Sequence, residues 1–367
     1  MPTLASANLP DRASKFTQGA ASNTNKPPTL LESLRASVIP TQFPQPIGAR
    51  NAGLLNAWQT WLQRRPDGSE TVAINDWING VTCRLDDAVR MFRHALQTDP
   101  SWRNGRAAIA GGERAGTAVI TMGAAPLMFW CRAHVLIELT PALEQQLTHS
   151  DIGDDLPVCL FRAPAPACFL RFGQIFQDAI ISAPEHTATE KRHLTGVYLF
   201  DGRNSGARSI DLVCVFLLPQ VGVYSTRTIE LVFYDENESV LAQIRRACQI
   251  PELRPHLVSI IQTVAKVFFY YQQPGVPHVT ESDYTAAQHQ LARRSGKKAT
   301  KVLRRITNLY DRVVLGPAEF VQRQHGELTP HLRRGHFRLQ PYGPECSLRK
   351  VIFLAPTWVG ADRMLNH

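Results

Sequence analysis

The segment from Val213 to Leu218 is apolar at every position. Because neighbouring residues of a strand point to opposite sides, a strand of this kind is stable only where both faces of its sheet are covered. This segment therefore predicts a central strand. Three other segments with β-branched or aromatic residues are also predicted to be strands, at residues 168–172, 196–200 and 228–234.

Helical patterns lie on both sides of these predicted strands. Residues 85–96 and 257–271 carry apolar side chains at helical spacing. Thr140 followed by Pro141 predicts a helix start, with Thr140 as the N-cap and Pro141 at the first helical position. Two apolar stretches, residues 128–139 and 302–309, are expected to be strands. The chain is therefore expected to have an α+β fold.

The 367 residues are enough for two or three domains, at about 100–200 residues per domain. Residues 1–50 contain seven prolines among many small and polar residues, so we expect a disordered, flexible tail. A helix that starts at Asn51 would open a mixed helix/strand body, residues 51–280, which we expect to recognise a protein. The last part, residues 281–367, is expected to be a smaller, basic, β-rich C-terminal module.

The net charge of +9 comes from the end of the chain. From Tyr284 onward there are 15 Lys and Arg residues against 5 Asp and Glu residues, whereas the preceding part has 25 against 26. Such asymmetry indicates an anionic partner for the C-terminal module, with nucleic acid as the first choice. The alternative is a solvated basic face that only keeps the protein in solution.

Several other classes of protein have no support in the sequence. No apolar run of about 18 residues is present, and no secretory signal pattern opens the chain, so we expect no membrane contact. The seven cysteines are irregularly spaced, which favours reduced thiols in a cytoplasmic protein. His331, His336 and Cys346 match no common zinc spacing, and no nucleotide-binding or hydrolase motif occurs. We expect neither a metal nor a cofactor.

Two histidines, three arginines and a tyrosine lie within residues 331–342. Arginine binds phosphate oxygens through its planar fork, and histidine can move protons near neutral pH. Phe337 and Tyr342 are expected to stack on unpaired bases. The alternative is a basic β-hairpin whose histidines only cap turns or stack.

These patterns select two groups of residues. The candidate catalytic residues are His331, His336 and Tyr342. The predicted nucleic-acid-binding residues are Arg293, Arg294, Lys297, Lys298, Lys301, Arg304, Arg305, Arg333, Arg334 and Arg338.

The C-terminal residues also resemble a known family. A basic stretch, residues 293–305, precedes an Arg-Arg-Gly-His-Phe-Arg-x-Gln motif at residues 333–340, then Tyr342-Gly343 and an apolar Lys-Val-Ile-Phe-Leu-x-Pro strand. This order resembles a module of phage, plasmid and bacterial proteins, a group that includes a type V-A anti-CRISPR protein. The resemblance covers about 70–80 residues.

The resemblance implies a regulatory protein of a mobile genetic element. For the anti-CRISPR member it implies a lowered level of the CRISPR effector, through action on the nascent effector chain and its messenger RNA. The implied partners are a protein, with the nascent effector chain as the candidate, and RNA or the ribosome. Two alternatives stay open: a ribonuclease or RNA-binding protein that uses the His/Arg segment, and an interaction protein with no role in nucleic-acid binding. Enzymatic activity is not expected unless the ribonuclease interpretation holds.

Overall fold

The computed structural model describes residues 83–90, 123–126, 128–129, 132–181, 193–218, 223–247, 254–306, 309–318 and 331–359. The expected tail and the helix expected from Asn51 lie outside these residues. The described residues belong to two compact units. One contains Ser282–Asp311 and Pro341–Arg349, and the other contains the remainder. The domain boundaries expected at residues 50 and 280 stay predictions.

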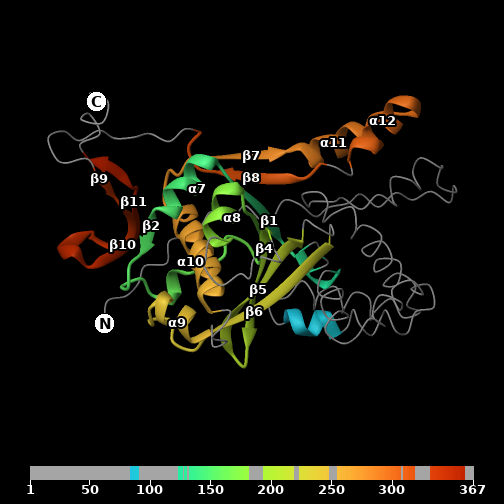
Figure 1. The fold of residues 1–367 in the computed structure, drawn as a ribbon. Coiled ribbons are helices and arrows are strands. Elements are labelled where there is room, and N and C mark those ends of the chain that lie inside the picture. The colour runs from blue at the N-terminus through green and yellow to red at the C-terminus, as the bar shows by residue number, and fades with distance from the viewer. Residues whose placement is uncertain are drawn as a thin grey trace. The chain divides into compact units, whose positions relative to one another are not determined.

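A seven-stranded mixed sheet organises the larger unit, with the strand order β6-β5-β4-β3-β1-β8-β7 (Figure 1). The strands β3 to β6 are antiparallel to their neighbours in that series, whereas β1 is parallel to both β3 and β8. Their bounds are β1 (His134–Leu139), β3 (Ala167–Arg171), β4 (His193–Asn204), β5 (Ala207–Leu218), β6 (Val223–Phe233), β7 (His278–Ser282) and β8 (Asp311–Leu315). The predicted α+β class is confirmed.

Strand β5 contains the apolar segment from Val213 to Leu218 that was predicted to be a central strand. It lies between β4 and β6, which confirms the predicted interior position. Leu212 and Cys214 are buried in the main hydrophobic core, and Val213 and Val215, which alternate with them, are buried as well. Both faces of this strand are therefore covered.

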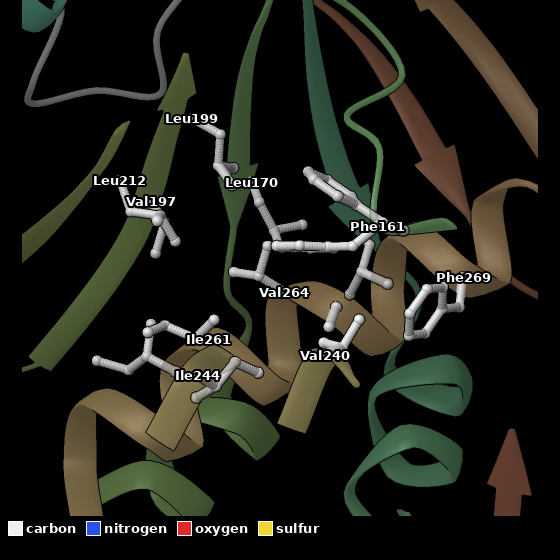
Figure 2. Close-up of a cluster of buried hydrophobic side chains, with 14 of the residues drawn as sticks. Phe161, Leu170, Val197, Leu199, Leu212, Val240, Ile244, Ile261, Val264 and Phe269 are labelled. Atoms are coloured by element: carbon white, nitrogen blue, oxygen red, sulfur yellow. The ribbon is translucent and has the colours of Figure 1, made fainter. Parts of the chain in front are cut away.

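Four helices contribute to the main core: α7 (Pro141–Thr148), α8 (Gln174–Ile181), α9 (Val240–Ala247) and α10 (Arg254–Tyr271). Figure 2 shows Ile261 and Val264 of α10 beside Leu170 of β3 and Val197 of β4. Full burial of each such side chain stabilises the fold by about 1.5–3 kcal/mol. None of the helices in the described part of the chain is long and apolar enough to cross a membrane.

The start of α7 agrees with the sequence prediction. The Thr140 hydroxyl accepts a hydrogen bond from the Leu143 N–H at 3.2 Å, and Pro141 is the first helical residue. Helix α7 in turn supports α8, because the Glu144 carboxylate accepts a hydrogen bond from the Gly173 N–H just before α8. A Cβ atom on Gly173 would lie 2.6 Å from a carboxylate oxygen of Glu144, so a larger residue there would displace this carboxylate.

Buried polar contacts join residues 83–90 to the sheet and to Arg132. The Asp211 carboxylate of β5 accepts a hydrogen bond from the Leu85 N–H at 3.0 Å, and Arg132 donates to the Cys83 carbonyl oxygen at 2.5 Å. Residues 85–90 are helical, as predicted, and residues 91–96 lie outside the described part.

The expectation of a strand over residues 128–139 is wrong at its start. Met128 and Phe129 are helical, and β1 begins only at His134. The Arg132 N–H donates to the Met128 carbonyl oxygen at 3.2 Å, which is the helical spacing. The apolar composition that favoured a strand instead reflects burial, since both side chains are completely covered.

A three-stranded sheet has the order β11-β10-β2, with β10 (Gly335–Tyr342) parallel to β2 (Ser150–Ile152). The third strand is β11 (Leu348–Leu354). Separately, β12 (Thr357–Val359) pairs antiparallel with β9 (His331–Arg333). Short 3-10 helices lie at Val158–Leu160 and Pro344–Cys346.

The smaller unit contains helices α11 (Asp283–Ala292) and α12 (Gly296–Ile306), which we call the helical hairpin. The expectation of a strand over residues 302–309 is wrong for residues 302–306, which belong to α12. Helix α12 begins at Gly296, which has a φ of 57° that glycine adopts without the strain caused by a Cβ atom.

The buried Asp211 predicts a specific pH dependence. Burial raises the pKa of its carboxyl from 3.8 to about 6, although the hydrogen bond from Leu85 lowers it. A raised folded-state pKa means that the folded protein binds the proton more tightly than the unfolded chain does. The contribution of Asp211 to stability is therefore present below about pH 4 and is lost as the pH rises to about 6.

We expect Asp211→Asn to be more stable than the parent at pH 7, by at most about 3 kcal/mol, because asparagine keeps an acceptor oxygen without the charge. At pH 4 the two proteins should differ much less. Thermal unfolding at both pH values measures this difference, with Asp154→Asn at an exposed position as the control. An equal difference at the two pH values would contradict the assignment.

Candidate nucleic-acid interface

The helical hairpin has a small apolar core of its own. Tyr284, Ala287 and Leu291 of α11 are buried together with Ala299 and Val302 of α12. The two α12 residues are three positions apart, which places them on one side of the helix. The opposite side of α12 is left for solvent.

The basic residues of the hairpin occupy that solvent side. Lys297, Lys298, Lys301 and Arg305 are all exposed, and at about 100° per residue they lie within a sector of roughly 100° around the α12 axis. We call these four residues the α12 cationic stripe. Arg293 and Arg294, in the connection between the helices, are exposed as well, and the side chain of Arg304 lies outside the described part. No acidic residue occurs in the sequence between Asp283 and Asp311.

The base of the hairpin is closed by Asp311. Its carboxylate accepts hydrogen bonds from the backbone N–H groups of Tyr284 at 3.0 Å and Thr285 at 3.1 Å, and from the Thr285 hydroxyl. These N–H groups lie in the first turn of α11, where Ser282 makes no side-chain cap. A carboxylate is favourable at a helix N-terminus, so Asp311, the first residue of β8, stabilises the start of α11.

The Arg-Arg-Gly-His-Phe-Arg-x-Gln motif is divided between packing and surface. Phe337 is completely buried, and its ring stacks on Phe353 of β11 at 4.6 Å and lies 5.9 Å from Phe269 of α10. The expectation that Phe337 stacks on unpaired bases is therefore wrong. An aromatic residue gains more from packing in this core than from an exposed position on the strand.

Gly335 is required by close packing on two sides. Its N–H donates to the His149 carbonyl oxygen at 2.9 Å. A Cβ atom at this position would lie 2.4 Å from the Ser150 hydroxyl oxygen and 2.7 Å from the Leu354 carbonyl oxygen. The glycine of the motif thus allows β10 to pass between β2 and β11.

The three arginines of the motif are exposed, and polar contacts are seen for two of them. Arg334 forms an ion pair with Asp151 at 3.0 Å, in which the two side chains are 63% and 58% exposed. The Arg338 guanidinium donates to the Gln340 side-chain oxygen at 3.0 Å. An ion pair this exposed contributes at most about 1 kcal/mol, but Asp151 offsets the positive charge of Arg334 at this place.

Lys266 makes a partly buried polar contact that was not predicted from the sequence. Its ammonium group donates to the Leu147 carbonyl oxygen in the last turn of α7 at 3.0 Å. The pKa of Lys266 is lowered from 10.5 to about 8, chiefly by burial; Asp151 opposes this shift, and Arg334 adds to it. The sequence did point to this lysine, because after Arg254 it is the single Lys, Arg, Asp or Glu residue in an otherwise apolar and neutral α10. Its contact indicates a structural role at the end of α7.

The candidate catalytic residues are distributed over different elements. His331 belongs to β9 and is paired in register with Val359, whereas His336 belongs to β10 and is paired with Asp151 of β2. Tyr342 is the exposed last residue of β10, and the side chain of His331 lies outside the described part. The two histidines are therefore in separate sheets, and their catalytic assignment stays a prediction.

The His336 imidazole is half-buried, and none of the described residues forms a hydrogen bond with it. A general base is normally oriented by a second polar group, and no such group is seen here within the described residues. In the same part of the chain, no three His, Cys, Asp or Glu side chains are grouped to hold a metal ion.

Comparison with known proteins identifies the family. Residues 137–361 match the model of the AcrVA2-like family, described as the anti-CRISPR type V subtype A2 family. The chain belongs to the AcrVA2-like family. The match extends from β1 to the end of the described residues, so it includes the helical hairpin and the Arg-Arg-Gly-His-Phe-Arg-x-Gln motif. Family membership confirms the resemblance seen in the sequence and supports an anti-CRISPR function, which implies contact with a CRISPR component.

The crystal structure of AcrVA2 is similar to this chain with a TM-score of 0.40 and 13% sequence identity, over 79% of this chain and 99% of the AcrVA2 chain. No curated protein matches the chain in sequence. The family assignment therefore rests on the match over residues 137–361.

The division of the motif into packing and surface positions can be tested by two substitutions. We expect Gly335→Ala to reduce the free energy of unfolding by about 1–3 kcal/mol, because the new methyl group overlaps the Leu354 carbonyl oxygen. His336→Ala, at the neighbouring half-buried position, should cost less than about 1 kcal/mol. Urea unfolding of both variants measures the two values. Equal losses would show that Gly335 does not have the packing role assigned to it.

Proposed function

We propose that this AcrVA2-like protein lowers the level of a type V-A CRISPR effector by acting on the nascent effector chain and its messenger RNA. The observation that carries the proposal is the family match over residues 137–361, which includes the mixed sheet and both basic segments. A protein that acts during synthesis needs a surface for the emerging chain and a means of staying near the messenger or the ribosome.

The arrangement of the chain supports two such roles. The mixed sheet with helices α7 to α10 forms a well-packed body, and a rigid body of this kind suits recognition of a peptide. The basic residues lie in other segments, the helical hairpin and strands β9 and β10, and suit contact with RNA or the ribosome. We assign protein recognition to the body and RNA contact to the basic segments.

The alternative function is a ribonuclease that uses His331, His336 and Tyr342. Acid–base cleavage of a phosphodiester needs its proton-transferring groups within hydrogen-bond reach of one reacting site. The placement of the two histidines in separate sheets gives that alternative less support than a binding role.

A co-expression experiment tests the proposal. The full-length protein is produced together with a type V-A effector, and the effector protein and its messenger are both quantified. We expect both to fall, because the proposed action couples the nascent chain to its messenger. The same fall is expected when the effector gene is recoded with synonymous codons, since the peptide is unchanged.

The matched control is an effector gene with a stop codon directly after the start codon, which yields the messenger without the chain. Its messenger level should not respond to the protein. If the effector is inhibited while its protein and messenger levels stay constant, the proposed mechanism is wrong. A fall in the stop-codon messenger would instead favour the ribonuclease.

A further inference from the structure

The helical hairpin carries a high density of positive charge, which favours an anionic partner. Seven Lys and Arg residues and no acidic residue lie between Asp283 and Asp311 in the sequence. Four of the seven form the α12 cationic stripe on the solvent side of one helix. Like charges at this density repel one another, so an exposed anionic partner would relieve that repulsion.

A membrane surface fits this hairpin poorly. Helices that lie in the membrane interface bury a large apolar face in the lipid. In the hairpin the apolar face is already used, because Ala299 and Val302 pack against α11. The exposed large hydrophobic side chains of the described residues are Tyr234, Val279 and Tyr342, and none of them belongs to the hairpin.

We propose that the helical hairpin binds the phosphate backbone of RNA along the α12 cationic stripe. This inference deepens the RNA part of the proposed function. From Lys297 to Arg305 the stripe covers about 12 Å of helix axis, at a rise of about 1.5 Å per residue. A row of cations of this length can contact more than one phosphate of an RNA strand.

The hairpin is better suited to this role than the Arg-Arg-Gly-His-Phe-Arg-x-Gln motif. In the motif, Phe337 faces the core, and Arg334 lies against the carboxylate of Asp151. Each basic side chain of the α12 cationic stripe, by contrast, stands on a helix with no acidic residue of its own. The structure thus ranks the two groups of predicted nucleic-acid-binding residues, which the sequence treated alike.

Phosphate contacts fix position on a nucleic acid but do not read its bases. The hairpin therefore supplies affinity for RNA without selecting a messenger. Selection of the target is left to recognition of the nascent chain, which is attached through the ribosome to the messenger that encodes it. This division would let one basic surface act on any messenger whose product the body recognises.

Binding of a fluorescein-labelled, mixed-sequence RNA of about 20 nucleotides to the full-length protein tests the site by fluorescence anisotropy, with salt varied between about 50 and 200 mM. The test variant replaces Lys297, Lys298, Lys301 and Arg305 with glutamine, which has a similar helix propensity. We expect a loss in affinity of at least about tenfold at low salt. The slope of log K against log salt should become shallower by about 3, because four contacts contribute about 0.7 each on a single strand.

Two control variants separate the site from general charge. Lys297→Arg, Lys298→Arg and Lys301→Arg, made together, keep the charge and should keep the binding. Arg333→Gln, Arg334→Gln and Arg338→Gln, made together, should reduce affinity by less than about threefold. An unchanged melting temperature of the glutamine variant shows that the hairpin core is intact.

The inference is overturned if the glutamine variant binds RNA as well as the parent at both salt concentrations, or if the motif variant loses as much affinity. It is also overturned if the parent binds poly-L-glutamate but not RNA, which would indicate an acidic protein partner. Effector levels measured with the same variants report on the proposed function separately. A variant that has lost RNA binding but still lowers the effector supports the RNA site and excludes RNA binding from the mechanism.

Discussion

Burial of helix α10 on more than one side is the constraint on which the rest of the larger unit depends. Ile261 and Val264 pack against the mixed sheet, as Figure 2 shows, while Phe269 lies 5.9 Å from Phe337 of β10. Tyr270 makes an edge contact with Phe353 of β11, with ring centres 5.6 Å apart. One helix thereby gives the seven-stranded and three-stranded sheets a common core. Aromatic pairs of this kind add about 0.5–1.5 kcal/mol each to the free energy gained by burial.

This packing has a direct consequence for function. Because β10 turns Gly335 and Phe337 inward, these two residues of the Arg-Arg-Gly-His-Phe-Arg-x-Gln motif are buried and are not available on the surface. The basic residues of the helical hairpin are under no such constraint, since that hairpin has a separate apolar core and leaves the long side chains of its α12 cationic stripe in solvent. Residues with the same chemistry in the sequence therefore have different roles in the structure.

Much of the fold could be predicted, because many helices and strands follow from patterns among residues that are close in the sequence. The interior position of β5 followed from an apolar segment, the start of α7 from Thr140-Pro141, and α10 from apolar spacing. The strand expectation was wrong for residues 302–306 because an apolar, β-branched stretch is ambiguous between helix and strand. Residues 302–306 are helical in the structure because a helix allows Ala299 and Val302 to pack together against α11.

The site was harder to predict because it depends on contacts that are distant in the sequence. The parallel pairing of β10 with β2, and the cap that Asp311 supplies to α11, have no local signal. The burial of Phe337 follows from those pairings and from α10, so its apparent role as a base-stacking residue could not be excluded beforehand. Charge, in contrast, could be counted in the sequence, and it identified the basic stretch at residues 293–305 without showing that these residues belong to a helical hairpin.

Hydrogen–deuterium exchange of the full-length protein, with and without RNA, tests most directly whether the hairpin and the motif have these separate roles. Added RNA should slow amide exchange in residues 283–306, where the cationic side chains stand on an exposed helix. Exchange in residues 335–342, which are held by β2, β11 and the core, should be the same in both states. Slower exchange in residues 335–342, with no change in residues 283–306, would contradict the assignment of RNA contact to the hairpin.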